Sequence, residues 1–491
     1  MKMLNKIVPV FCLTLQLCFS QQEDHPVNPY LADSPWPTYH GNSYRQSYSE
    51  IAGPMDANNV KVKTLKGIKG GTSPWTYFSE KYPDGQRVLL QSNATHFYKI
   101  VDDKQGLRIV AKVKIDSDWL KSFGWNLLQT KGNVWYTYDP KYNPQKGQTT
   151  KLFKITDSQH NNPYSRLVVR DTFDFKGIVA NKVQNFGINY RGEIAFYSGS
   201  IKKQDGAVFG ILSSNFDLLD TLRIRPVTNE LFGHNAFPID ENNSMYVVTT
   251  HRLIRIDWDG EALKLGFEAW YDFVNDGPTG TFAEGSGTTP TLMGFGEGND
   301  QLIIVADGHK RNNLLAFWRK IPGDWKGIKG EDIRLAGKIK LPAAKRFSNK
   351  FQSIENSPTV YGYDVAIAQF NGFLGQGKNP LKGVQKVHWN IEKNIFELAW
   401  VNTDINMNGV LTYSKGSNLV YGSGREEKCN YYYYGLDWDS GKLRFRKHLG
   451  KVCKWLKNPL DDGGCQQIIA EDGSIYYAGG ASLVKLEKRT P

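Results

Sequence analysis

FPIDENNSMYVVTTHRLIRIDWDGEALKLGFEAW (Phe237–Trp270) has the pattern of four short strands separated by turns. Phe237–Asp240 and Ser244–Thr250 flank the turn residues Glu-Asn-Asn, and Leu253–Asp257 follows at once. An Asp-Gly pair then turns the chain into Leu263–Trp270. Runs of β-branched and aromatic residues bounded by turn residues are typical of strands. The segment therefore predicts one four-stranded antiparallel unit.

The opening of this unit recurs along the chain as a short apolar segment that begins with small or polar residues and runs into a turn. The openings are roughly 48 to 70 residues apart, which is typical of propeller blades with loops. Eight such openings occur: GTSPWTYF (Gly71–Phe78), FGWNLLQT (Phe123–Thr130), NFGINY (Asn185–Tyr190), GHNAFPID (Gly233–Asp240), GSGTTPTLMG (Gly285–Gly294), ENSPTVYG (Glu355–Gly362), NGVLTYSKG (Asn408–Gly416) and GCQQIIAEDG (Gly464–Gly473).

The repeat predicts an all-β chain with a single eight-bladed β-propeller, and seven blades are the alternative. The last blade ends after its third strand, whereas the alternating segment Val60–Ile68 precedes the first opening. We expect this N-terminal strand to close the last blade, because closure protects the edges of the ring. The expected organisation is a signal peptide (1–20), an N-terminal lead-in (21–59) and the propeller (60–491). Five tryptophans are expected between blades: Trp135, Trp258, Trp270, Trp318 and Trp438.

The first residues have the pattern of a secretory signal. Lys2 and Lys6 precede the apolar run Ile7–Phe19, which is too short to span a bilayer, and cleavage is expected after Ser20. An uncleaved anchor and a lipoprotein attached through Cys18 are the alternatives. We expect no other membrane span, and a periplasmic or secreted protein.

The formal net charge of +12 is spread along strand-like segments rather than gathered in a basic run. Most of these charges should face solvent, although a groove for an anionic ligand is an alternative. Export and the lack of a dense basic run argue against a nucleic-acid partner. Beyond the signal, Cys429, Cys453 and Cys465 allow one disulfide in an oxidising compartment. We expect Cys453–Cys465, with Cys429 as a competitor for either partner.

Two segments resemble a known superfamily of propellers. SPWPTYHGNSYRQSY (Ser34–Tyr48) is similar to the start of quinoprotein-like propellers with pyrroloquinoline-quinone repeats, and YYYYGLDWDSGKLRFRKHLG (Tyr431–Gly450) is similar to their repeat. The resemblance implies the propeller fold, and pyrroloquinoline quinone with calcium as one candidate cofactor. The cofactor itself is not identified by the sequence, because the adjacent cysteine pair and the Cys-x-x-Cys-His haem motif of such dehydrogenases are absent. No His-x-His, His-Glu-x-x-His or Cys-x-x-Cys motif predicts a metal site.

In a propeller, the starts of the inner strands and the ends of the second strands meet at one rim around the axis. We therefore expect ligand-binding residues at these positions: Asn235, Lys310, Arg311, Asn356, Asn371, Asn408, Arg425 and Glu426.

Candidate catalytic groups lie in three of these segments. In ADGHKRNN (Ala306–Asn313), Asp307 could set the tautomer of His309 as a general base, although Asp307 could instead stabilise the turn at Gly308. Glu355 is a candidate acid, base or metal ligand, or an acceptor of backbone N–H groups. His234 is similar to the histidine nucleophile at a strand start of propeller arylsulfate sulfotransferases, and a structural histidine is the alternative.

Three functions follow from these features. The first is an exported propeller that binds, and in one version turns over, a polar or anionic small molecule such as a saccharide at the axial mouth. The second is a non-catalytic scaffold that binds or assembles another protein. The third is a dehydrogenase that depends on pyrroloquinoline quinone.

Overall fold

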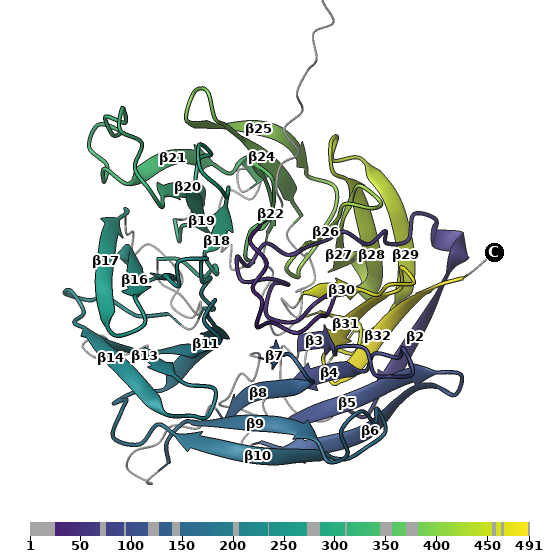
Figure 1. The fold of residues 1–491 in the computed structure, drawn as a ribbon. Coiled ribbons are helices and arrows are strands. Elements are labelled where there is room, and N and C mark those ends of the chain that lie inside the picture. Colours follow the sequence, from purple (N-terminus) through teal and green to yellow (C-terminus); the bar gives the residue numbers. More distant parts are fainter. Residues whose placement is uncertain are drawn as a thin grey trace, which may run out of the picture.

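The computed structural model describes residues 25–68, 75–92, 95–115, 127–139, 148–199, 206–233, 235–272, 285–309, 312–343, 356–369, 382–453, 458–462 and 466–489. The chain forms eight small antiparallel sheets arranged around one axis, so the prediction of an eight-bladed propeller is confirmed (Figure 1). Among the described residues, no helix has the length and hydropathy that a membrane crossing requires.

Each blade is a meander in which consecutive strands pair from the axis outward. The first four blades consist of β3 (Trp75–Phe78), β4 (Leu89–Ser92), β5 (His96–Asp103) and β6 (Gly106–Lys114); β7 (Leu128–Thr130), β8 (Val134–Asp139), β9 (Lys151–Asp157) and β10 (Leu167–Asp174); β11 (Val183–Ile188), β12 (Ile194–Ser198), β13 (Ala207–Leu212) and β14 (Leu218–Ile224); and β15 (Met245–Val248), β16 (Arg252–Trp258) and β17 (Leu263–Trp270).

Blades five to eight follow the same order, and a strand from the N-terminal region completes the last of them. They consist of β18 (Thr291–Met293), β19 (Leu302–Ala306), β20 (Asn313–Trp318) and β21 (Leu335–Lys340); β22 (Thr359–Tyr361), β23 (Asp364–Ala368), β24 (Val384–Asn390) and β25 (Ile395–Asn402); β26 (Thr412–Ser414), β27 (Leu419–Arg425), β28 (Asn430–Asp437) and β29 (Leu443–Lys451); and β30 (Gln467–Ile469), β31 (Ile475–Gly479), β32 (Ser482–Lys488) and β2 (Val60–Lys66). Single turns of 3-10 helix occur at η1 (Ala57–Asn59) and η4 (Glu427–Cys429).

The predicted closing strand is confirmed, because β2 pairs antiparallel with β32 from Val60 opposite Lys488 to Lys66 opposite Ser482. The inner strand of blade four is weaker than expected. It is reduced to one bridge between Ile239 and Met245, because Pro238 has no N–H to donate to a neighbouring strand. The Ile239 N–H is donated to Ser43 O, and the N–H groups of Leu292 and Val360 are likewise donated to residues of the N-terminal region.

Residues 25–49, here named the axial segment, lie inside the ring (Figure 1). The segment ends in β1 (Tyr48–Ser49), which pairs parallel with β26. It has a hydrogen bond to every blade. From blade one to blade eight these are Ser34 Oγ to Phe78 O, Ala32 N to Gln129 O, Asn28 Nδ2 to Ile188 O, Ile239 N to Ser43 O, Leu292 N to Tyr44 O, Val360 N to Gln46 O, Tyr413 N to Ser47 O, and His40 N to Gln466 Oε1.

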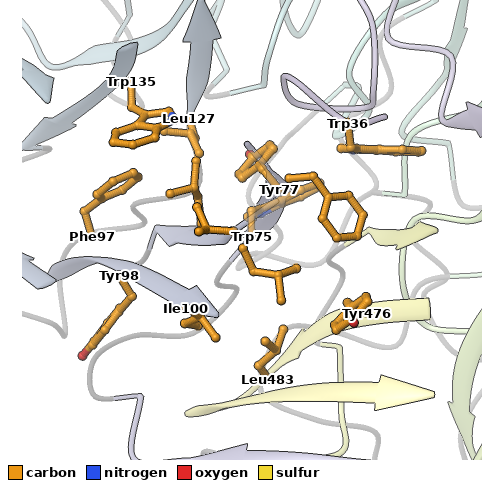
Figure 2. Close-up of a cluster of buried hydrophobic side chains, with 14 of the residues drawn as sticks. Trp36, Trp75, Tyr77, Phe97, Tyr98, Ile100, Leu127, Trp135, Tyr476 and Leu483 are labelled. Carbon is orange, nitrogen blue, oxygen red and sulfur yellow. The ribbon is translucent and has the colours of Figure 1, made fainter. Parts of the chain in front are cut away.

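These contacts are with the last residue of the inner strand in blades one and three, with the middle residue in blades two, five, six and seven, and with the residue before the inner strand in blade eight. The axial segment therefore occupies the axis along the inner strands. Its Trp36 is fully buried in the hydrophobic cluster between blades eight and one, together with Trp75, Tyr77 and Tyr476 (Figure 2). The end of the axis where the inner strands begin is here named the mouth.

Threonine hydroxyls join the inner strands of successive blades near the mouth. Thr291 donates to Pro358 O (3.4 Å), Thr359 to Leu411 O (2.8 Å) and Thr412 to Gln467 O (2.6 Å). Each hydroxyl is buried, and each satisfies a backbone carbonyl of the next blade. These bonds fix the spacing of blades five to eight around the axis.

The disulfide joins Cys429 to Cys453, with 5.0 Å between the Cα atoms, so the predicted pairing of Cys453 with Cys465 is wrong. Cys429 directly precedes β28 and Cys453 follows β29, and these strands are paired with Asn430 opposite Lys451. Strand register therefore brings the two sulfurs together. Cys465 lies outside the described residues.

Replacing Cys429 and Cys453 together by serine is expected to lower the free energy of unfolding by about 2 to 4 kcal/mol, since the crosslink restricts the unfolded chain. Cys465→Ser should leave it unchanged. Denaturant unfolding of both variants, with peptide mapping of the unreduced protein, tests this. A mapped peptide pair that contains Cys465 would contradict the assignment.

Candidate functional site at the axial mouth

The end of the second strand in blade five carries Asp307 and His309. The Asp307 carboxylate accepts hydrogen bonds from the backbone N–H groups of Asn313 (2.7 Å) and His309 (3.3 Å), and from the Asn313 side chain. The nearest approach of His309 Nε2 to Asp307 Oδ2 is 3.8 Å. The carboxylate thus holds the turn, and the hydrogen bond that would set the histidine tautomer is not formed.

Burial raises the pKa of Asp307 despite its hydrogen bonds to Asn313. The turn around it is tightly packed, because a Cβ atom at Gly308 would lie 2.2 Å from Gly285 O. This contact presses the loop of blade five against the Gly285–Thr289 segment. His309 Nε2 and Asn312 Oδ1 are buried, and within the described ranges neither atom has a hydrogen-bond partner.

The equivalent position in blade six is occupied by Gln369, which the sequence analysis did not select. Gln369 directly follows β23, and its backbone N–H is donated to Gly383 O (2.9 Å). Gln369 has an exposed fraction of 0%, and neither its Oε1 nor its Nε2 has a hydrogen-bond partner among the described residues. Its place after the second strand, equivalent to Asp307 and to the end of β27, is the signal that could have identified it.

Blades six, seven and eight are joined at the mouth by a chain of amides and acids. Asn356 Nδ2 donates to Asn408 O (2.9 Å), and Asn408 Nδ2 donates to Asp461 Oδ1 (3.4 Å). Asp461 also accepts from Tyr431 (3.1 Å), and burial followed by the Asp461 charge raises the pKa of Tyr431. The neighbouring Asp462 accepts from Ser423 (2.6 Å) and Gln467 (3.1 Å). The structure therefore brings Asn356 and Asn408 together, as predicted for residues of one rim.

Other predicted residues have structural contacts of their own. Asn235 Nδ2 donates to Ser286 O (3.3 Å) across blades four and five. Arg425 Nη2 lies 3.2 Å from Cys429 Sγ. Glu426 accepts hydrogen bonds from Tyr434 (2.7 Å) and Arg446 (2.7 Å) of its own blade. Five predicted residues lie outside the described part of the chain: His234, Lys310, Arg311, Glu355 and Asn371.

His40 of the axial segment lies beside the start of β30. Its ring has an exposed fraction of 0%, and Nδ1 is 2.9 Å from Ser47 Oγ. Burial, followed by the charge of Arg45, holds the pKa of His40 well below its ordinary value of 6.5. The ring is therefore neutral, and Nε2 has no partner.

Because folded His40 resists protonation, its contribution to stability is present above about pH 6.5 and is lost as pH falls. At about pH 5 the loss should be about 2 kcal/mol. His40→Asn, which tolerates the φ of 57° at this position, should reduce this pH dependence. Urea unfolding of both proteins at about pH 7 and about pH 5 measures the difference. If the free energy of unfolding falls equally in both proteins between about pH 7 and about pH 5, His40 is not the source of this pH dependence.

Comparison with known proteins agrees on the architecture. No family model matches the chain. An uncharacterized protein of Archaeoglobus fulgidus is 27% identical over 449 residues, which cover 85% of this chain and 81% of that protein. Quinohemoprotein alcohol dehydrogenase from Comamonas testosteroni has a TM-score of 0.53 at 12% identity, covering 95% of this chain and 82% of that one. A europium-containing methanol dehydrogenase has a TM-score of 0.52 at 9% identity, covering 90% and 89%. The chain therefore has the fold of the quinoprotein-like eight-bladed β-propellers.

Proposed function

We propose that this chain is an exported propeller that binds a polar, hydroxyl-bearing ligand at the mouth. The observation that carries the proposal is Gln369, whose two side-chain polar atoms are buried without partners at this end of the axis. An unsatisfied buried polar group costs about 1 to 3 kcal/mol. A side chain with this cost is expected where it serves a ligand.

The other groups at the mouth agree with a ligand that both donates and accepts hydrogen bonds. Among the described residues, Asn312 Oδ1 accepts no hydrogen bond and His309 Nε2 has no hydrogen-bond partner. The buried carboxylates of Asp307, Asp461 and Asp462 add acceptors rather than positive charge. Binding is preferred to turnover because the Asp307 carboxylate is hydrogen-bonded to Asn313 and to the His309 backbone N–H rather than to the His309 ring.

The described residues of the mouth fit pyrroloquinoline quinone poorly. That cofactor carries three carboxylates and requires cations, whereas buried acids and neutral amides predominate here. Within the described ranges, no group of three or more His, Cys, Asp or Glu side chains could hold a metal ion. The Cys429–Cys453 disulfide joins residues 24 positions apart and is not an adjacent pair.

The scaffold alternative has a separate basis on the outside of the ring. Leu218 and Leu219 of β14 and Leu265 of β17 are exposed by 42%, 43% and 45%. These strands belong to neighbouring blades and contact each other. A protein partner could bury these exposed leucines without involving the mouth.

Gln369→Met tests the proposal, because methionine has a similar length and no hydrogen-bonding group to leave unmet. Its melting temperature should equal or exceed that of the parent chain, while ligand-induced thermal shifts with sugars, sugar acids and polyols should be lost. A bound ligand at 100 times its dissociation constant would otherwise stabilise the protein by about 2.7 kcal/mol.

Gln385→Met is the matched control in the same blade. Gln385 Oε1 accepts the Ala343 N–H (3.0 Å), so this variant should be less stable yet keep ligand binding. Thermal shifts retained by Gln369→Met, or an unstable Gln369→Met, would contradict the proposal. If no compound in the panel shifts either protein, the scaffold alternative replaces it.

A further inference from the structure

Aromatic rings of the axial segment and of blade one pack against each other where the inner strands of blades eight and one begin. Tyr39 and His40 of the axial segment lie next to Trp75, the first residue of β3. The Tyr39 ring centroid is 4.1 Å from that of Trp75, with 37° between the planes, and 4.1 Å from that of His40. Figure 2 shows Trp75 next to Tyr77 in the buried cluster below.

Three polar atoms in this cluster of rings have no hydrogen-bond partner within the part of the chain that the structure describes: Trp75 Nε1, His40 Nε2 and Gln466 Nε2. Trp75 has an exposed fraction of 2%, and His40 and Gln466 of 0%. The Gln466 amide is oriented unambiguously, because its Oε1 accepts the His40 backbone N–H at 2.8 Å. Its Nε2 therefore offers two N–H donors, and Trp75 offers a third.

The chemistry of these atoms selects a class of ligand. The neutral His40 ring can donate or accept at Nε2, depending on the proton shared between Nδ1 and Ser47, and a hydroxyl satisfies either state. The apolar C–H face of a pyranose ring packs on aromatic rings, and its hydroxyls reach donors at the edge. We propose that Tyr39, His40, Trp75 and Gln466 form a subsite for a pyranose ring of a saccharide.

Arg45 holds the backbone of this subsite through hydrogen bonds. Its guanidinium donates to Tyr39 O (2.8 Å), to Thr38 Oγ1 (3.0 Å) and to Phe237 O (2.9 Å). Burial lowers the pKa of Arg45 to about 10, so the group keeps its charge at neutral pH. It fixes the backbone that carries Tyr39, which makes it a positioning residue.

The inference rests on the proposed function and specifies its ligand. The full chain from Gln21 is applied to an array of neutral and uronic-acid oligosaccharides, and the strongest binder is titrated by calorimetry. Trp75→Phe keeps a ring and removes the N–H, and Gln466→Met removes the amide donors. Each should weaken binding at least tenfold, which corresponds to about 1.4 kcal/mol.

Trp318→Phe is the matched control, since Trp318 is also buried with an unpartnered Nε1 but lies in the third strand of blade five. It should change affinity less than twofold. Binding of no oligosaccharide, unchanged affinity in Trp75→Phe and Gln466→Met, or Trp75-dependent binding of pyrroloquinoline quinone would each overturn the saccharide subsite.

The two proposals fail in different ways. If no oligosaccharide on the array binds but another polar compound binds in a Gln369-dependent way, the saccharide subsite is wrong and the proposed ligand site at the mouth stands. A saccharide whose affinity depends on neither Trp75 nor Gln369 overturns both.

Discussion

A chain that lacks residues 21–55 but keeps the closing strand β2 is expected not to fold cooperatively. The deletion removes buried Leu31, Trp36, Tyr44 and Tyr48 from the centre of the ring. Each large apolar side chain contributes about 1.5 to 3 kcal/mol when fully buried. Their sum approaches the 5 to 15 kcal/mol that typically separates a folded domain from its unfolded state.

The deletion also removes hydrogen-bond partners from all eight blades. Urea unfolding followed by tryptophan fluorescence should show a broad transition or none. A chain that begins at His25 is the control and should unfold like the parent. A sharp transition in the shortened chain, at the same urea concentration as in the parent, would show that the ring is stable without the axial segment.

Arg319→Ala is expected to destabilise the protein by about 3 to 5 kcal/mol, because it leaves buried acids without their cation. Arg319 follows β20, and its guanidinium contacts Asp240 Oδ2 (3.1 Å), Glu241 Oε2 (3.2 Å) and the Tyr44 hydroxyl (3.0 Å). The side chains of Arg319 and Asp240 are each exposed by only 2%. Burial alone would lower the pKa of Arg319, but Tyr246, Tyr44 and the two acids hold it well above its ordinary value.

This cluster joins the axial segment to blades four and five. Removing the Arg319 guanidinium should therefore lower the free energy of unfolding of the whole ring. Denaturant midpoints of the parent and of Arg319→Ala measure it. Lys264→Ala is the control, since Lys264 and Asp259 form an exposed pair at 2.6 Å that should contribute nothing measurable. Equal midpoints for all three proteins would contradict the role of Arg319.

The propeller and its closing strand could be predicted because they depend on local pattern. Turn residues and alternating strands recur in every blade, and Val60–Ile68 has the alternation of an outer strand that blade eight lacks. The position of the axial segment could not be predicted in this way. Its partners, such as Gln129 and Val360, are far away in the sequence and are selected only when the ring closes.

The errors have physical causes in strand register. A short loop between Cys453 and Cys465 suggested their pairing, whereas register places Cys429 opposite Cys453. Trp270 was expected between blades with four other tryptophans, yet it is 43% exposed at the end of outer strand β17. Successive side chains of a strand alternate between its faces, so a one-residue difference changes which face a tryptophan occupies.

For the mouth, the sequence predicted which residues lie together better than it predicted their chemical roles. Asn356 and Asn408 lie in contact as expected for starts of adjacent inner strands. Gln369 and Trp75 were not selected, because their importance comes from lacking a partner, which sequence does not show. The roles of His234, Lys310, Arg311, Glu355 and Asn371 stay predictions.

Hydrogen exchange of the full chain tests most directly whether the axial segment occupies the centre of the ring. The N–H groups of Ile239, Leu292 and Val360 are donated to Ser43, Tyr44 and Gln46. Their exchange should be as slow as that of the middle strands of the blades, because it requires global opening. Exchange at the rate of an exposed peptide would show that the segment does not occupy the axis.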